Sequence, residues 1–519
     1  MKKIVHSIYA AAFSLIALAA CDLTTQPTTS LDADSVFSTT EGGDKVLNGT
    51  WRYLLETWNT YANPGFGATL RANDAMGMDV AVNTNYGFRD HYVFTAIYGK
   101  GGTNSLSWTL AYSTINNVNG VIAYIDDAEG TEEDRRRIKA QAYGLRGFMY
   151  LHLASLYSFA IDKDPDAVCV PVYTEPSDAS TEGKPASSVS EVYAQAIEDL
   201  EIALELIPQN YSRSSKHKID EEVILGLLSR ATLYARQWEK ARTYSNQLLE
   251  KNNYLMSESE YRSGFNDISN AEWIWGHPQT AEQSSPSYQF HYLDTTTPDS
   301  YYYSFNADPY FRDLFDDEDY RKSMIYWAPN PAITPDPASD TAVEIWMRYA
   351  KFKFREGEGL LADLVLMRTS EIYLINAEAK ARLNDADAIN VLNQLKAARG
   401  AQTVSGISGE ALLEEIWIER RKELFGEGFS LVDIIRNQQT IVRNEYPGDE
   451  IDYLYTDDNG VEHLLKGNPK GHRQVYFPGG RPFEPNSKYL LYRITDTEER
   501  ENTNLYSRYP KLSIYSEED

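Results

Sequence analysis

The residues that most often carry catalysis are scattered through this sequence, without the spacings that enzymes use. No histidine lies four residues before another, which is the spacing of a zinc-binding helix, and no G-x-S-x-G nucleophile motif is present. His152 lies in an apolar run and is expected to be a hydrogen-bonded core residue. The sequence therefore predicts a protein that is not an enzyme. The eight histidines are His6, His91, His152, His217, His277, His291, His463 and His472.

Two short patterns fit ligand-binding motifs in part. Residues 457–460 (DDNG) lack the full spacing of a calcium loop and are interpreted as a turn. Residues 357–362 (GEGLLA) fit a dinucleotide pattern, but Glu356 and Glu358 would repel a pyrophosphate and no βαβ series follows. We therefore predict neither a metal site nor a cofactor.

Aromatic side chains gather in two turn-rich segments, residues 61–107 and 257–357, which show little helical periodicity. Long irregular segments inside a folded chain are more often binding surface than framework. Tyrosine and tryptophan offer flat apolar faces to sugar rings, while Asp, Asn and Arg bind their hydroxyl groups. A peptide ligand would instead need free strand edges or groups that recognise its backbone. The composition favours an oligosaccharide and leaves a peptide as the alternative.

The charge of the chain excludes several classes of partner. The 519 residues carry a formal net charge of −27, so the basic surface that a nucleic-acid binder needs is missing. Binding to anionic lipid through basic patches is excluded for the same reason. Only two cysteines are present, Cys21 and Cys169, which rules out a disulfide framework or a cysteine-based zinc site.

The first twenty residues form an export signal. Lys2 and Lys3 precede a short apolar run that ends in Leu18, Ala19, Ala20 and Cys21, and the run is too short to span a bilayer. This ending resembles a bacterial lipobox, which implies cleavage before Cys21 and lipidation of its thiol. The alternative is an ordinary signal peptide followed by an incidental cysteine. Residues 21–33, rich in threonine, are expected to form a flexible tether.

Amphipathic helices account for most of the remaining chain. Residues 190–207 form the cleanest stripe, and two pairs of stripes follow at 227–249 and 373–398, each pair joined by a short turn. Small residues where two helices cross are typical of tetratricopeptide-like hairpins, which must stack on a neighbour to bury their apolar faces. We expect a helical scaffold at about 34–60, 108–256 and 358–436, and a loop-rich tail at 437–519.

Three charged residues in a row, Glu419, Arg420 and Arg421, lie on one of the predicted helices. They could form an anion site. The favoured interpretation is a buried ion network that orients this helix against its neighbours.

Several sequence blocks resemble the SusD/RagB-like family of outer-membrane lipoproteins from Bacteroidetes. The blocks lie in the family's order along nearly the whole mature chain, although the prolines of the family's closing element are missing here. They include residues 145–152 (LRGFMYLH), 366–379 (LMRTSEIYLINAEA) and 419–428 (ERRKELFGEG).

This resemblance implies a fold and a role. The fold would be a single, mainly α domain over residues 34–519, with a tetratricopeptide-like helical-repeat scaffold and large irregular, partly β insertions at 61–107 and 257–357. The role would be to capture a nutrient at the cell surface and deliver it to a SusC-like TonB-dependent β-barrel transporter. The protein would be held in the outer membrane by its lipid.

The family fold would also bring the two aromatic insertions together on one face. The ligand-binding residues are then expected to be Asp74, Asn83, Tyr86, Arg89 and Tyr98 from the first insertion, and Tyr292, Tyr301, Tyr302, Tyr303 and Trp327 from the second. Several of these aromatic residues could instead be core residues of the irregular layer. A glycoside hydrolase and a protein-interaction scaffold without a small ligand remain as alternative functions.

Overall fold

The computed structural model describes residues 36–56, 64–83, 87–282, 286–457 and 459–509. Cys21, the tether and Tyr86 lie outside the described residues, and so does the side chain of Tyr98.

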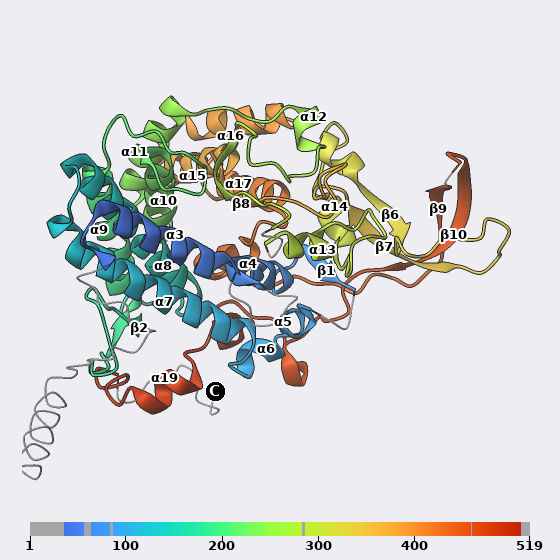
Figure 1. The fold of residues 1–519 in the computed structure, drawn as a ribbon. Helices are drawn as coiled ribbons and strands as arrows, with labels where there is room; N and C mark the ends of the chain where they lie inside the picture. Colours follow the sequence, from blue (N-terminus) through green and yellow to red (C-terminus); the bar gives the residue numbers. More distant parts are fainter. Residues whose placement is uncertain (1–35, 57–63, 84–86, 283–285, 458, 510–519) are drawn as a thin grey trace, which may run out of the picture.

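Ten helices that lie in or beside the predicted scaffold segments build most of the described chain (Figure 1). Their amphipathic stripes pack against one another, as the sequence pattern predicts. They are α3 (Thr40–Glu56), α7 (Thr103–Tyr124), α8 (Glu132–Leu156), α9 (Val189–Leu206), α10 (Glu221–Tyr234), α11 (Trp238–Lys251), α15 (Thr369–Arg382), α16 (Ala388–Ala398), α17 (Glu410–Glu423) and α18 (Ser430–Arg436).

Local chemistry fixes where these helices begin and how closely they pack. Ser188 and Glu191 form a reciprocal capping box at the start of α9. Gly147 of α8 faces α9, where an added Cβ would lie 2.8 Å from Leu200, so the glycine lets the two helices approach. The amide of Asn376 donates to Ser245 at 2.8 Å and joins α15 to α11. The predicted helical hairpins α10–α11 and α15–α16 are therefore neighbours.

The insertions contain short helices and strands. In the first they are α4 (Gly65–Ala75), β1 (Val80–Val82), α5 (Arg89–Tyr92) and α6 (Thr95–Tyr98). In the second they are α12 (Glu258–Tyr261), β4 (Trp273–His277), η2 (Pro286–Gln289), α13 (Phe290–Leu293), β5 (Phe305–Ala307), α14 (Pro309–Arg312), η3 (Tyr320–Met324), β6 (Ile325–Pro329) and β7 (Val343–Tyr349).

The remaining elements complete the chain order. They are η1 (Ile125–Asp127), β2 (Val168–Pro171), β3 (Ala186–Ser188), β8 (Leu364–Arg368), β9 (Ile451–Thr456), β10 (Glu462–Lys470), η4 (Pro478–Gly480), η5 (Lys488–Leu490) and α19 (Asp496–Glu501). Strands β2 and β3 form one two-stranded sheet, and β4 and β8 form another.

A six-stranded sheet lies at the end of the molecule away from the paired helices (Figure 1). Its strand order is β1-β5-β7-β10-β9, and β6 also pairs with β7. Strand β10 runs parallel to β7, whereas the other pairs are antiparallel. The β9–β10 hairpin projects from the body of the molecule at the right of the view.

The prediction of a mainly helical scaffold with irregular, partly β insertions is confirmed. One detail of the prediction is wrong. Residues 65–75, expected to be irregular, form α4, whose Arg71, Asn73 and Asp74 side chains are buried and hydrogen-bonded, so its sequence shows no amphipathic stripe. Most of the described tail is loop, as expected, and it also contains the β9–β10 hairpin.

The core is rich in large aromatic side chains. Trp273 and Trp275 of β4 are fully buried, as are Tyr150 and Tyr157 of the α8 region. None of the described helices combines the length and the hydrophobicity needed to cross a membrane.

Candidate functional site

The two aromatic insertions meet through their strands. Val80 of β1 pairs with Ala307 of β5, and Val82 pairs with Phe305, in antiparallel register. The backbone amide of Asn83 donates to the carbonyl of Ser304 at 3.2 Å, which extends this pairing by one step. Segments more than 200 residues apart in the sequence therefore share one sheet.

Stacked rings organise the tyrosine cluster formed by Tyr288, Tyr292, Tyr301 and Tyr302. Tyr292 stacks on Tyr302 with ring centres 4.5 Å apart, and Tyr301 stacks on His291 at 4.0 Å. Burial lowers the pKa of His291 to about 4, so the imidazole is neutral at pH 7. Such pairs hold each ring in a fixed orientation.

The first insertion approaches this cluster through Gly87. Its φ of +63° lies in the left-handed region, and an added Cβ would lie 2.4 Å from the ring of Tyr292. Only glycine combines that conformation with so close an approach. Phe88 follows and packs edge-on against Tyr292 at 4.8 Å.

Among the expected ligand residues whose side chains are described, most of those that reach the surface come from the second insertion. Tyr301 is 59% exposed, and Tyr302, Tyr303 and Trp327 are half-buried. In the first insertion, Arg89 is exposed, and its guanidinium lies 3.4 Å from the carboxylate of Asp90. Asn83 is half-buried, with its amide 3.5 Å from the carbonyl of Tyr303.

Two other expected ligand residues, Asp74 and Tyr292, are buried. Both carboxylate oxygens of Asp74 accept from the backbone N–H of Gly428, at 2.9 and 3.0 Å, and one lies 3.4 Å from Arg71. Burial raises the pKa of Asp74 to about 7, although Arg71 and the Gly428 amide oppose the rise. Asp74 thus links α4 to the turn after α17, and Tyr292 forms the buried side of the tyrosine stack.

An open groove of about 1000 Å³ lies at the sheet-containing end of the molecule, and Trp327 is one of the residues that line it. Strand β6 and the loop after it form one wall, and β9 forms the other. The residues that line this groove are Thr296, Pro298, Arg312, Tyr326, Trp327, Ala328, Pro329, Asn330, Pro331, Ala332, Ile333, Thr334, Met347, Arg348, Asp452, Tyr453, Leu454, Tyr455 and Thr456.

Sequence reasoning missed the hairpin side of the groove. Tyr453 and Tyr455 lie in the tail that was expected to be mostly loop. A signal was present: residues 451–456 (IDYLYT) are rich in β-branched and aromatic residues and come directly before the DDNG turn. That turn is confirmed, because Oδ1 of Asp457 accepts from the backbone amides of Asn459 and Val461, both at 2.9 Å.

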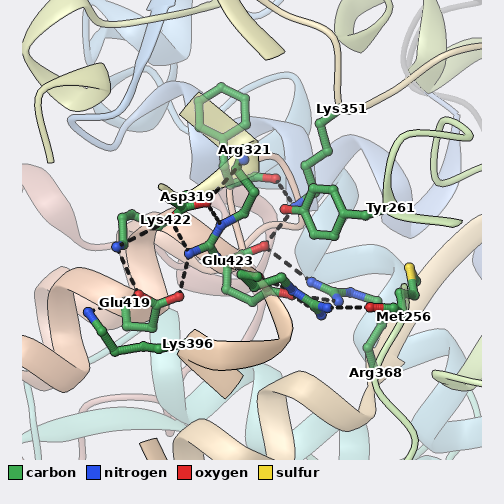
Figure 2. Close-up of polar contacts among 12 residues, drawn as sticks. Met256, Tyr261, Asp319, Arg321, Lys351, Arg368, Lys396, Glu419, Lys422 and Glu423 are labelled. Atoms are coloured by element: carbon green, nitrogen blue, oxygen red, sulfur yellow. Dashed lines mark hydrogen bonds and ion pairs between the residues drawn. The ribbon is translucent and has the colours of Figure 1, made fainter. Parts of the chain in front are cut away.

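The charged residues of α17 form a buried ion network, as predicted (Figure 2). Glu423 lies near its centre and accepts from Arg321 at 2.7 Å, Arg399 at 2.9 Å and Arg368 at 3.0 Å. Glu419 pairs with Arg321 at 2.6 Å and with Lys422 at 2.9 Å. Because these side chains are buried and paired with one another, the network positions α17 and is not a site for a free anion.

Electrostatics keep the carboxylates of this network ionised. Burial alone would raise the pKa of Glu423, but Arg399, Arg368 and Arg321 outweigh it and hold the pKa well below its usual range. The pKa of Glu419 falls to about 2 because Arg321 and Lys422 likewise outweigh the effect of burial. The next two residues of α17 extend the network, since Arg420 pairs with Asp433 and Arg421 with Asp79, both at 2.6 Å.

The described histidines and carboxylates do not assemble into a recognisable metal centre: no group of three or more possible ligands is found among the described residues. His152 is a core histidine, as expected, with Nε2 2.8 Å from the hydroxyl of Ser107. Burial lowers its pKa to about 3.

The protein consists of paired helices and, at one end, a sheet with aromatic side chains and an open groove. This combination defines a helical-repeat fold with a place for a ligand. Two family models match the chain. One, described as "Starch-binding associating with outer membrane", matches residues 34–233, and the other, described as "SusD family", matches residues 241–510. The chain belongs to the SusD family, a family of carbohydrate-binding proteins that associate with the outer membrane.

Solved structures agree with this assignment. A SusD-like carbohydrate binding protein from Bacteroides vulgatus is 66% identical, with a TM-score of 0.89, over 92% of this chain and 100% of that one. A SusD superfamily protein from Bacteroides thetaiotaomicron shares the fold at 24% identity and a TM-score of 0.67, over 78% and 90%. Another SusD superfamily protein, from Bacteroides fragilis, shares the fold at 19% identity and a TM-score of 0.65. The match covers 91% of this chain and 99% of that one. The comparison with curated proteins found no match.

Proposed function

We propose that this protein is a cell-surface lipoprotein that captures an oligosaccharide and delivers it to a SusC-like TonB-dependent outer-membrane transporter. The family description and the 66% identical carbohydrate binding protein support the choice of ligand class. The lipidated residue would be Cys21. In this role the protein binds the glycan and leaves its glycosidic bonds intact.

One observation carries the proposal. Among the described residues, all but two of the large hydrophobic side chains that are exposed lie between Tyr301 and Tyr476, in or near the non-helical end. The two exceptions are Tyr124 and Tyr254. Three of these exposed side chains, Tyr326, Ile333 and Leu454, line the open groove. An exposed ring such as Tyr326 suits a sugar-binding surface, because sugar rings stack on aromatic faces.

The transporter contact rests on the family resemblance and on physical reasoning. A lipid anchor would confine both proteins to one membrane plane and raise their effective concentration, so strong affinity in bulk solution is not required. We propose that the helical-repeat surface packs on loops of the barrel. Co-purification in mild detergent should recover a β-barrel protein of the outer membrane.

A titration tests the binding role. The purified protein is applied to an array of plant, host and microbial oligosaccharides, and the strongest ligand is then titrated by calorimetry. The variant Tyr301→Ala, which lacks one exposed ring, should bind the ligand about 1–3 kcal/mol more weakly than the parent. Tyr124→Ala, which removes an exposed tyrosine from α7, is the matched control and should bind like the parent.

Three outcomes would contradict the proposal. The parent protein could bind no glycan on the array, or Tyr301→Ala and Tyr124→Ala could behave alike with unchanged melting curves. Release of new reducing ends from the bound oligosaccharide would show a hydrolase instead.

A further inference from the structure

The groove between β6 and β9 has the dimensions of a ligand site. Its volume of about 1000 Å³ lies at the upper end of the range of roughly 300–1,000 Å³ found for small-molecule sites. It is open along one side, so a ligand can extend beyond it. Thr296 and Pro298, from the loop that leads to Tyr301, form part of its lining and join it to the tyrosine cluster.

Aromatic faces line the β6 wall of the groove. Tyr326 is 41% exposed, with the guanidinium of Arg348 5.7 Å from its ring centre. The half-buried ring of Trp327 packs against Tyr446 at 5.3 Å, which fixes its orientation. Fixed rings of this kind are suited to stack on the apolar faces of sugars.

The opposite wall contributes a buried hydroxyl group without a partner. Tyr453 is only 4% exposed, and its hydroxyl has no hydrogen-bond partner among the described residues. Its ring lies over Gly467 of β10, where an added Cβ would be 2.9 Å from the ring. Buried tyrosine hydroxyls almost always find a partner, because an unsatisfied one is costly. A hydroxyl of a bound sugar would supply that partner.

The charges of the groove are unusual for so acidic a protein. Asp452 is neutralised by Lys466 at 2.6 Å, whereas Arg312 and Arg348 form no ion pair with any described carboxylate within 4.0 Å. Each arginine donates to one backbone carbonyl, Arg312 to Ile325 at 2.8 Å and Arg348 to Pro329 at 2.9 Å. The remaining N–H groups of both guanidiniums are available to a ligand.

The carboxylate nearest in effect to Arg312 among the described residues, that of Asp317, is paired with another side chain. Asp317, whose pKa Arg312 helps to lower, forms its ion pair with Lys322 at 2.6 Å. The groove therefore carries two positive charges that have no ion-pair partner among the described residues, on a chain with a net charge of −27. Arginine is the side chain best suited to bind a carboxylate through paired hydrogen bonds.

We propose that this groove binds an acidic oligosaccharide. Arg312 and Arg348 would bind sugar carboxylates, Tyr326 and Trp327 would stack on sugar rings, and the Tyr453 hydroxyl would bond a sugar hydroxyl. This inference rests on the proposed function and narrows its ligand class to glycans that contain uronic or sialic acid.

The test uses the full-length mature protein and probes that differ only in charge. Oligogalacturonides, glucuronoxylan oligosaccharides, hyaluronan oligosaccharides and sialylated glycans are compared with their carboxyl-reduced or methyl-esterified counterparts. At least one acidic probe should bind, and its neutralised form should bind at least about tenfold more weakly. The set of acidic probes also identifies which source of sugar acid is recognised.

Variants then place the bound glycan in the groove. Arg348→Gln and Arg312→Gln should each weaken the acidic probe by about tenfold or more, and Arg348→Lys should recover part of that loss because it restores the charge. Tyr453→Phe removes a single oxygen and should weaken binding by about two- to tenfold. Arg52→Gln on α3 and Tyr124→Phe on α7 are matched controls that should bind like the parent.

Each other outcome overturns the inference in a recognisable way. Binding of neutral glycans alone would remove the acidic ligand and leave the proposed function standing. Acidic binding that is unaffected in Arg348→Gln, Arg312→Gln and Tyr453→Phe, all folded by their melting curves, would place the site elsewhere. Binding of a tryptic casein peptide pool and of no glycan would overturn both proposals.

Discussion

Asp308 is a buried carboxylate that the fold stabilises poorly. Burial and the nearby charge of Asp79 together raise its pKa to about 7, against the backbone amides of Tyr310 and Phe311. Its Oδ1 atom has no hydrogen-bond partner among the described residues. A carboxyl group whose pKa is raised on folding does not destabilise the folded state below its unfolded pKa. It destabilises the folded state fully only above its folded pKa.

We therefore expect Asp308→Asn to stabilise the protein in a pH-dependent way. Asparagine keeps the capping position at the start of α14 without the charge. The variant should be more stable than the parent by about 1–4 kcal/mol at pH 8, and the gain should shrink toward zero near pH 4. Urea denaturation at several pH values measures this difference. A gain that does not change with pH would show that folding does not raise the pKa of Asp308.

Glu423 has the opposite environment, since three guanidiniums share one carboxylate. Replacing it leaves buried positive charges uncompensated, so Glu423→Gln should cost about 3–5 kcal/mol of folding free energy. The control is Glu258→Gln, which removes an exposed pair with Arg262 and should cost less than about 1 kcal/mol. Equal unfolding midpoints for the two variants would contradict the role assigned to the network.

At the scale of elements, the β9–β10 hairpin controls the shape of the groove. It is joined to the sheet where Gly467 pairs with Val343 of β7, and the space above this glycine is filled. An added Cβ would lie 2.3 Å from Ile345 and 2.9 Å from Tyr453. The hairpin and the Tyr453 ring must shift to accommodate any side chain at this position.

Gly467→Ala should therefore loosen the hairpin at a cost of about 1–3 kcal/mol. Amide hydrogen exchange should become faster in β9 and β10, while the helices keep their protection. Gly448→Ala is the control, because nothing lies within 4 Å of its added Cβ. Unchanged exchange in both variants would mean that the hairpin does not depend on contact at Gly467.

The elements differ in how far the sequence could predict them. Helix α9 was predictable because its apolar stripe and its capping box agree. Helix α4 was not, since burial on all sides replaces the stripe with partnered polar residues such as Asn73 and Asp74. The hairpin carried a strand pattern in its residues, but only the fold shows that it returns to the sheet and faces β6.

The candidate site illustrates the same limit. Residue types indicated which segments are rich in aromatic side chains, and the two insertions do meet through β1 and β5. They could not indicate which rings face solvent. Tyr292 and Tyr301 lie nine residues apart, yet one is buried and the other is 59% exposed, because the chain folds back on itself at α13.

At the scale of the whole molecule, the proposed location depends on Cys21, which lies outside the described residues. We expect Cys21→Ala to abolish palmitate labelling and membrane fractionation, because lipidation of the Cys21 thiol is the proposed anchor. The matched control is Cys169→Ala, since Cys169 is buried in the core and should not be lipidated. Continued labelling of Cys21→Ala would contradict the anchor.

The central claim is that the non-helical end of the molecule binds an oligosaccharide. The most direct measurement is a crystal structure of the protein with the strongest oligosaccharide from the array. We predict sugar density between β6 and β9, with rings against Tyr326 or Trp327 and a sugar hydroxyl within hydrogen-bond distance of Tyr453. Sugar density on the helical scaffold, with an empty groove, would contradict this account.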